Sequence, residues 1–256
     1  MPVAGIDVGA VATKSVILEN GKLVAYSITP TGLNGALSSK NALNDALIKG
    51  KLSLRNIECI VSTGYGRRNV DSVNMVITEI TAHATGVKTL FPIARTIIDV
   101  GGQDSKVISL DDDGRVINFI MNDKCAAGTG KFLEVLAKTL EINLFDLGDL
   151  SGKSASDIKI SSMCTVFAES EVISLLTQNR KKEDIVAGIR GSISRRVVAL
   201  ARQVGIKQKV VFTGGVAKNS GMRISLENEL GFKIKVSEEP QITGALGAAI
   251  IAEKQI

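Results

Sequence analysis

The sequence predicts an α/β protein built from two similar halves, and three observations favour this fold class. The pattern Ile-Asp-Val-Gly occurs at residues 6–9 and again at residues 98–101, and in both copies a lysine follows the glycine by five positions. Each copy continues into an apolar, β-rich run and reaches a hairpin signal, at 20–21 in the first copy and at 113–114 in the second. Later segments carry apolar residues at the three- and four-residue steps of helices. This β-β-β-α duplication predicts two α/β domains that face each other across a cleft.

Each half is expected to open with a strand, a glycine-containing turn, a second strand, a hairpin and a third strand. The other expected strands are 58–62 and 209–212, and the expected helices are 133–140, 172–176 and 185–204. The two expected subdomains comprise residues 1–95 together with 240–256, and residues 96–239.

Length and composition limit the classes of protein to which the chain can belong. With 256 residues, of which 45% are apolar, it can bury one substantial core or two small ones. It has no run of ~18 uncharged apolar residues and no signal-peptide pattern at its start, so we expect a cytoplasmic protein that does not span a membrane. The net charge of +5 is spread along the chain and aromatics make up only 4% of residues, so nucleic acid is not an expected partner. An acidic protein partner or a bound anionic nucleotide would explain the net positive charge equally well.

The duplicated turn contains the residue types that bind phosphate and magnesium. An aspartate at the end of a buried strand, followed closely by glycine, places a carboxylate beside exposed backbone N–H groups that a phosphate can approach. Thr13 and Lys14 add a hydroxyl and a positive charge. We expect Asp7 and Asp99 to hold one Mg²⁺ through water, as a hard cation prefers. Two residues of the second turn are expected to orient an attacking water in phosphoryl transfer: Gln103 and Asp104.

Two further glycine clusters extend this pattern. Residues 213–219 follow a strand and precede an expected helix, which suits nucleoside contacts at a helix N-terminus. Residues 244–249 are small and allow close helix packing. Each glycine turn alone is typical of a plain hairpin or helix cap, but the four in this order resemble the superfamily of actin, sugar kinases and seventy-kilodalton chaperone ATPases. That resemblance implies ribonuclease H-like halves, a central nucleotide cleft and a C-terminal helix that crosses back to the first domain.

The superfamily resemblance also implies where ATP or ADP binds. Residues 7–9 would form the first phosphate loop, 99–102 the second and 213–215 the adenosine loop. The residues expected to contact the nucleotide are Gly9, Ala12, Thr13, Lys14, Gly101, Gly102, Gly130, Lys131, Gly214, Gly215, Lys218, Asn219 and Gln241.

The chain has three cysteines, an odd number that argues against a disulfide framework. Cys59 lies in an apolar strand and is expected to be a small core residue without a further role. Cys125 and Cys164 each precede an expected helix, where unpaired N–H groups favour the thiolate that binds metals. A two-fold dimer that contributes both cysteines from each chain would complete a four-thiolate site, for iron–sulfur or for zinc. Two unrelated helix-start cysteines are the simpler alternative.

The segments around both cysteines resemble the activators of 2-hydroxyacyl-CoA dehydratases, a family that includes ATPase subunits of benzoyl-CoA reductases. The similarity is carried by residues 98–106, 122–133 and 164–174, with further matches at 63–67 and 213–219, and it runs over essentially the whole chain. It implies a homodimer with one [4Fe–4S] cluster on its two-fold axis, held by the two cysteines just described. It further implies slow ATP hydrolysis coupled to transfer of one low-potential electron, from a reduced ferredoxin or flavodoxin to an iron–sulfur dehydratase.

Two other functions are compatible with parts of the sequence. A small-molecule kinase on the same fold, for example for a sugar, needs a dedicated substrate pocket and leaves the two cysteines unexplained. An actin-type scaffold predicts filaments or partner binding without iron. Among the remaining residues, His83 is expected to be a hydrogen-bonded helix residue, and Glu169 and Glu171 point to different helix faces and do not form an acid–base pair. Residues 64–68 suit a phosphate or partner contact and a plain charged turn equally well.

Overall fold

The computed structural model describes residues 1–150, 158–161 and 164–256. The chain divides into two compact units. Unit 1 contains Met1–Ile97, Leu110–Ile117 and Ser237–Ile256, and unit 2 contains Ile98–Ser109 and Asn118–Val236. Across the described ranges, no helix combines the length and the apolar character needed to cross a membrane.

Unit 1 is built on a five-stranded sheet. The strands lie in the order β3-β2-β1-β4-β5, and they are β1 (Pro2–Val8), β2 (Ala12–Glu19), β3 (Lys22–Pro30), β4 (Cys59–Thr63) and β5 (Met75–Val76). The central strand β1 pairs antiparallel with β2 and parallel with β4. The β2–β3 hairpin turns at Asn20 and Gly21, both with positive φ, as the Asn-Gly pair predicts.

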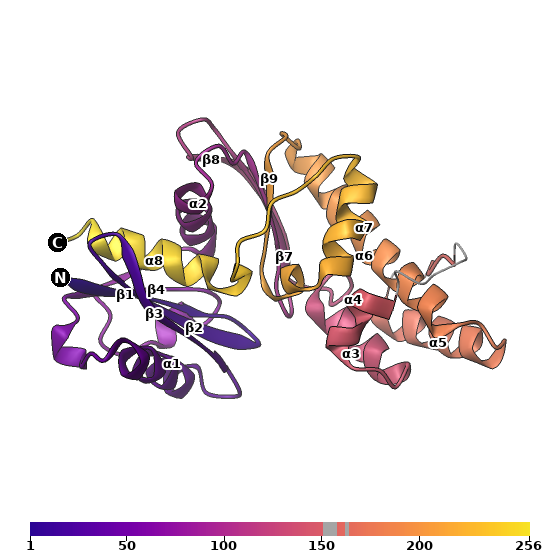
Figure 1. The fold of residues 1–256 in the computed structure, drawn as a ribbon, viewed down its shortest axis with the longest axis horizontal. Coiled ribbons are helices and arrows are strands. Elements are labelled where there is room, and N and C mark those ends of the chain that lie inside the picture. Colours follow the sequence, from indigo (N-terminus) through magenta and orange to yellow (C-terminus); the bar gives the residue numbers. More distant parts are fainter. Residues whose placement is uncertain (151–157, 162–163) are drawn as a thin grey trace. The chain divides into compact units, whose positions relative to one another are not determined.

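Two helices cover this sheet, α1 (Gly35–Gly50) and α8 (Thr243–Glu253), and α2 (Glu79–Leu90) packs against α8. Helices α1 and α8 lie on opposite faces (Figure 1), because β1 alternates: Ile6 packs in the core that α1 shares, and Val3 packs in the core that α8 shares. Helix α8 approaches β1 closely, since a Cβ on Gly5 would overlap the backbone oxygen of Ala245. The C-terminal helix thus returns to the first strand, as expected. Short 3-10 helices occupy Leu54–Asn56, Arg67–Asn69 and Pro240–Ile242.

Unit 2 combines a four-stranded sheet with a group of helices. The strand order is β8-β7-β6-β9, and the strands are β6 (Thr96–Val100), β7 (Ser105–Leu110), β8 (Val116–Asn122) and β9 (Val210–Thr213). The helices are α3 (Gly130–Thr139), α4 (Leu147–Leu150), α5 (Thr165–Thr177), α6 (Lys182–Val204) and α7 (Ser220–Leu230), with 3-10 turns at Leu144–Asp146 and Gly215–Lys218.

One hydrophobic core joins the sheet and helices of unit 2. Phe212 on β9 and Phe132 on α3 are fully buried in it, together with Ile189 and Ile193 on α6. The long helix α6 packs against both α5 and α7. It therefore links the part of unit 2 that carries Cys164 to the part that follows the adenosine loop.

Candidate functional site

In unit 1, Asp7 lies at the end of β1 and forms an ion pair with Lys14. The antiparallel register places the two residues opposite each other on β1 and β2, and the Nζ of Lys14 lies 2.9 Å from Oδ2 of Asp7. The Asp7 side chain is 7% exposed and that of Lys14 is 15% exposed. The intervening turn, called here the first phosphate loop (residues 9–12), is closed by a 3.2 Å hydrogen bond from Gly9 N to Ala12 O. The structure therefore brings four of the expected residues together.

Thr13 stabilises this loop through hydrogen bonds of its buried side chain. Its side chain is fully buried, and its hydroxyl lies 2.9 Å from the hydroxyls of both Thr31 and Ser38. Thr31 in turn donates a 2.7 Å hydrogen bond to the carbonyl oxygen of Gly9. The Thr13 hydroxyl, expected to face a phosphate, is used here to fix the loop to α1.

Gly64, directly after β4, lies very close to Asp7. Gly64 has a φ of 90°, and a Cβ there would overlap Oδ1 of Asp7 and lie 2.6 Å from the carbonyl oxygen of Val8. The same carbonyl accepts a 2.9 Å hydrogen bond from Gly66 N. Only glycine combines this φ with this approach, so the segment 64–68 is a structural neighbour of the first phosphate loop.

In unit 2, Asp99 ends β6 in the same way and pairs with Lys106 on β7. The Nζ of Lys106 lies 3.3 Å from Oδ2 of Asp99 and 2.7 Å from Oδ2 of Asp104. The Lys106 side chain is only 3% exposed. The turn, called here the second phosphate loop (residues 101–104), is closed by a 2.9 Å hydrogen bond from Gly101 N to Asp104 O. Its remaining expected residue, Gln103, is exposed.

A Thr-Gly pair also contacts this second aspartate. The hydroxyl of Thr213 donates a 2.8 Å hydrogen bond to Oδ1 of Asp99. Gly214 has a φ of 88°, and a Cβ there would overlap the carbonyl oxygen of Val100 and lie 3.0 Å from Oδ1 of Asp99. The Thr-Gly pair at 63–64 occupies the matching place in unit 1. This second repeat was not predicted, although in the sequence each pair follows a short apolar strand.

The other expected nucleotide residues lie at three places. Gly130 N and Lys131 N, at the start of α3, donate hydrogen bonds of 2.8 and 2.7 Å to the carbonyl oxygens of Gly101 and Gly102. Gly215 and Lys218 form the 3-10 turn after Gly214, where Lys218 is exposed. Asn219 caps α7 by accepting a hydrogen bond from Met222 N. Gln241 belongs to unit 1, in the 3-10 turn that precedes α8.

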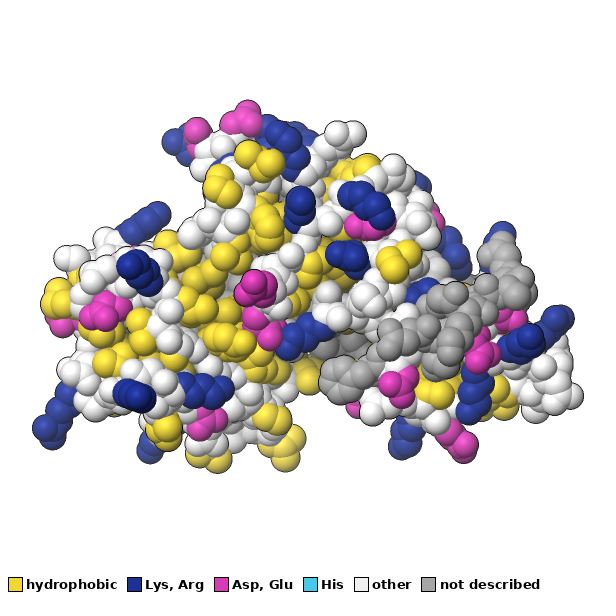
Figure 2. Space-filling view, viewed as in Figure 1, with side chains coloured by type: hydrophobic (Ala, Val, Ile, Leu, Met, Phe, Trp, Pro, Cys, Tyr) yellow, Lys and Arg dark blue, Asp and Glu magenta, His cyan; other side chains and the backbone are white. Residues whose placement is uncertain are grey.

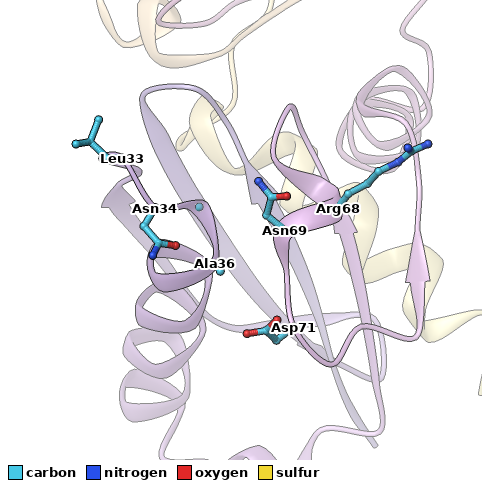
Figure 3. A pocket seen from close by; sticks show the side chains of 7 residues that line it. Leu33, Asn34, Ala36, Arg68, Asn69 and Asp71 are labelled. Atoms are coloured by element: carbon cyan, nitrogen blue, oxygen red, sulfur yellow. The ribbon is translucent and has the colours of Figure 1, made fainter.

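A surface hollow of about 450 Å³ lies beside the first phosphate loop, between the start of α1 and the 3-10 turn after β4. It is lined by Asn34, which caps α1, and by Arg68, Asn69 and Asp71. Figure 3 shows that the Arg68 side chain extends away from Asn34 and Asp71. The lining is polar and open, and it contains none of the expected nucleotide residues.

The three cysteines have different environments. Cys59 is buried in β4, and burial, aided by the negative charge of Glu58, raises the pKa of its thiol. Cys125 and Cys164 are both exposed. Cys164 lies immediately before α5 and makes no side-chain capping bond. Cys59 therefore behaves as the expected core residue, whereas the other two thiols are accessible.

The expectation that Cys125 immediately precedes its helix is wrong. Helix α3 begins only at Gly130. The chain first passes through Gly128, whose φ is 88°, and Thr129, whose backbone is extended. These two conformations are incompatible with a helix, so Cys125 lies in a turn of its own.

Among the residues that the structure describes, no group of three or more His, Cys, Asp or Glu side chains is arranged to hold a metal ion. The carboxylates of Glu169 and Glu171 make local hydrogen bonds. Glu169 accepts a 3.0 Å hydrogen bond from the hydroxyl of Thr139, and Glu171 accepts one of 3.0 Å from Ser161 N.

His83 is buried in α2, close to the point where Gly244 passes Asp7. The charges on the face seen in Figure 2 alternate in sign, with basic and acidic side chains interspersed.

The comparisons with known proteins agree with this arrangement. A family model described as the BadF/BadG/BcrA/BcrD ATPase family matches residues 4–252. The chain is 48% identical to the 2-hydroxyisocaproyl-CoA dehydratase activator of Clostridioides difficile, over 97% of this chain and 93% of that protein. It is 46% identical to the (R)-2-hydroxyglutaryl-CoA dehydratase activating ATPase of Acidaminococcus fermentans, over 98% of this chain and 96% of that protein.

Solved structures support the fold class. The activator of the 2-hydroxyisocaproyl-CoA dehydratase from Clostridium difficile, solved with bound ADPNP, matches 100% of this chain and 95% of its own at 47% identity, with a TM-score of 0.96. A ROK family glucokinase from Streptomyces griseus matches 99% of this chain and 100% of its own with a TM-score of 0.61, at only 12% identity. The fold class predicted from the duplicated turns is confirmed, and so is the resemblance to the dehydratase activators.

Proposed function

Because this chain belongs to the BadF/BadG/BcrA/BcrD ATPase family, we propose that it is an ATP-driven activator that delivers one low-potential electron to a 2-hydroxyacyl-CoA dehydratase or a related acyl-CoA reductase. Similarity to two named dehydratase activators over almost the full length of each supports this function. The observation that carries the proposal is that Cys125 and Cys164 are both exposed in a chain whose two phosphate loops are copies of one motif. A sugar kinase of the same fold has no use for those thiols and is not favoured.

The two phosphate loops would bind Mg-ATP together. Asp7 and Asp99 are the residues that would hold Mg²⁺ through water, and both are nearly buried carboxylates at strand ends. Lys14 keeps part of its side chain exposed and would contact a phosphate. Gln103, exposed in the second loop, would orient the attacking water, with Asp104 beside it. The loops after β9 would bind the adenosine, with Gln241 from unit 1.

The donor set of the chain fits half of a four-thiolate cluster site. Cys125 and Cys164 are exposed, and one copy supplies only these two accessible thiols, so a second copy would complete the site. A [4Fe–4S] cluster bound there would supply one-electron chemistry at low potential. Zinc would accept the same ligands, but it would supply no redox chemistry to an activator.

A homodimer would also explain why apolar side chains are exposed on α5, the helix that begins after Cys164. Three apolar side chains on this helix are strongly exposed: Val166 is 65% exposed, Phe167 68% and Ile173 48%. Such a patch next to a proposed shared metal site suits burial against a second copy. The proposed electron donor is a reduced ferredoxin or flavodoxin, and the proposed acceptor is the dehydratase component.

The proposal is tested by metal analysis of protein purified without oxygen. We expect a brown homodimer with about four iron and four sulfide per two chains. Cys125→Ala and Cys164→Ala should lose the iron while binding ATP normally, and Cys59→Ala is the matched control that should keep it. Iron-free monomer, or equal iron loss in all three variants, would contradict the proposal. Zinc in place of iron would leave a nucleotide-binding protein without the proposed electron transfer.

A further inference from the structure

The turn that carries Cys125 is closed at both of its ends by hydrogen bonds. The side-chain amide of Asn122 donates to the carbonyl oxygen of Cys125 at 2.9 Å and to that of Ala127 at 3.2 Å. At the other end, the backbone N–H of Thr129 donates to Ala126 O at 3.0 Å, and the Thr129 hydroxyl donates to the same oxygen. Residues 122–129 therefore form one short hydrogen-bonded segment, called here the cysteine turn.

The cysteine turn is bonded to the second phosphate loop through the residue that follows it. Gly130 N and Lys131 N donate to the carbonyl oxygens of Gly101 and Gly102, at 2.8 and 2.7 Å. This approach depends on glycine, because a Cβ at position 130 would lie 3.1 Å from Gly101 O and 3.3 Å from the Cα of Gly102. It would also lie 3.4 Å from the side chain of Val216, in the 3-10 turn that follows Gly214. Gly130 thus contacts the second phosphate loop and lies close to the turn that continues the adenosine loop.

Cys164 is attached to the molecule differently. It lies immediately before α5. Among the described residues, Ser161 N donates a hydrogen bond to Glu171 of this helix, and the hydroxyl of Thr139, the last residue of α3, donates one to Glu169. Helix α5 also packs against α3. The segment of Cys125 is therefore hydrogen-bonded to the second phosphate loop directly, through Gly130, whereas in the contacts described above Cys164 reaches that loop by way of α5 and the body of α3.

We propose that Asn122 and Thr129 are positioning residues that fasten Cys125 to the second phosphate loop, so that nucleotide occupancy changes the geometry of Cys125 more than that of Cys164. A nucleotide that shifts the carbonyls of 101 and 102 displaces Gly130, and the closed turn transmits this displacement to Cys125. The inference rests on the proposed function, because it treats Cys125 as a ligand of the shared metal site. It assigns the nucleotide response to one of the two cysteines.

The test uses the anaerobically prepared homodimer and the rate at which an iron chelator, bathophenanthroline disulfonate, removes its iron. The rate is measured without nucleotide, with Mg-ADP and with Mg-ADPNP. In the wild type, we expect the rates to differ by about fivefold between nucleotide states. In Asn122→Ala, iron content and ADP affinity should match the wild type, while the difference between states falls below about twofold.

Asn118→Ala is the matched control. Asn118 lies on the same strand, β8, is exposed, and uses its side-chain oxygen only for the neighbouring Phe119 N at 2.9 Å. This variant should respond like the wild type. Thr129→Val should resemble Asn122→Ala, and Thr129→Ser should restore the response. A wild-type response in Asn122→Ala would overturn the proposal.

A second measurement does not depend on bound iron and also covers a variant that fails to assemble the cluster. In cluster-free protein, the alkylation rates of Cys125 and Cys164 by iodoacetamide are followed by mass spectrometry with and without Mg-ADPNP. Nucleotide should change the rate at Cys125 and leave that at Cys164 within about twofold, and Asn122→Ala should remove the change. Equal changes at both cysteines would overturn the proposal. Wild-type protein that never takes up iron would instead contradict the proposed function.

Discussion

The two phosphate loops come from one repeated motif, but they use their lysines differently. In unit 1, Lys14 faces a single carboxylate, Asp7, and its side chain is 15% exposed. In unit 2, Lys106 lies between two carboxylates, Asp99 and Asp104, and its side chain is 3% exposed. One substitution accounts for the difference: the second turn ends in an aspartate where the first ends in Ala12.

This difference in exposure and in number of partners suits the two lysines to different roles, one to binding phosphate and the other to positioning carboxylates. A lysine with one partner and some exposure is able to turn toward a phosphate. A buried lysine with two partners is fixed, because moving it leaves two carboxylates without their counter-charge. We therefore assign phosphate contact to Lys14 and orientation of Asp99 and Asp104 to Lys106.

The largest expected effect is the loss of stability on removing the buried lysine. Lys106→Met should lower the free energy of unfolding by about 3–5 kcal/mol, because it removes the counter-charge of a nearly buried carboxylate, Asp99. Lys14→Met should lower it by about 1 kcal/mol, since water reaches that pair. Urea denaturation without nucleotide measures both. Equal losses would remove the distinction between the loops.

ATP turnover should distinguish the aspartates from the first lysine. Asp7→Ala and Asp99→Ala should each reduce kcat for ATP hydrolysis by about 10²–10³-fold, because each removes a carboxylate proposed to position Mg²⁺. Lys14→Met should mainly raise KM for ATP, by about tenfold. Steady-state kinetics on protein of verified iron content checks this. A Lys14 variant with unchanged KM would contradict the assignment of phosphate contact.

The smallest expected effect concerns the two matching threonines. The Thr213 hydroxyl bonds to Asp99, so Thr213→Val should cost about 1.5–3 kcal/mol of unfolding free energy. The Thr63 hydroxyl is buried and has no hydrogen-bond partner within the described part of the chain. Thr63→Val should therefore change stability by less than about 0.5 kcal/mol. Thermal unfolding of the two variants side by side provides the comparison, and a larger loss in Thr63→Val than in Thr213→Val would contradict the hydrogen-bond assignment.

The sequence allowed much of this architecture to be predicted, because the repeated Asp-Val-Gly turn is a local pattern. Strand, turn and hairpin positions follow from residues that are close together in the chain. The presence of lysine at a fixed distance from each glycine was also visible. The ion pairs themselves follow from the register of β1 with β2, which a one-residue slip would abolish.

Other features had no comparable local pattern. Asn122 bonds to main-chain carbonyls, and a carbonyl has no residue identity that a motif can contain. The approach of Gly64 to Asp7 depends on the parallel pairing of β1 with β4, which joins segments far apart in sequence. Cys125 was expected immediately before a helix, whereas α3 begins only at Gly130, because the φ of Gly128 is not encoded by its type alone. Long-range pairing and backbone conformation account for these errors.

The return of α8 to β1 has a consequence for biosynthesis. The strand β1 leaves the ribosome long before α8, yet the face that it shares with Ala245 and Ala249 is covered by that helix. Until that helix emerges, Val3 and Val16 stay open to solvent or to a chaperone. Folding of the first unit is thus completed only after α8 has been synthesised, and a ribosome that stalls before residue 243 would release an aggregation-prone chain.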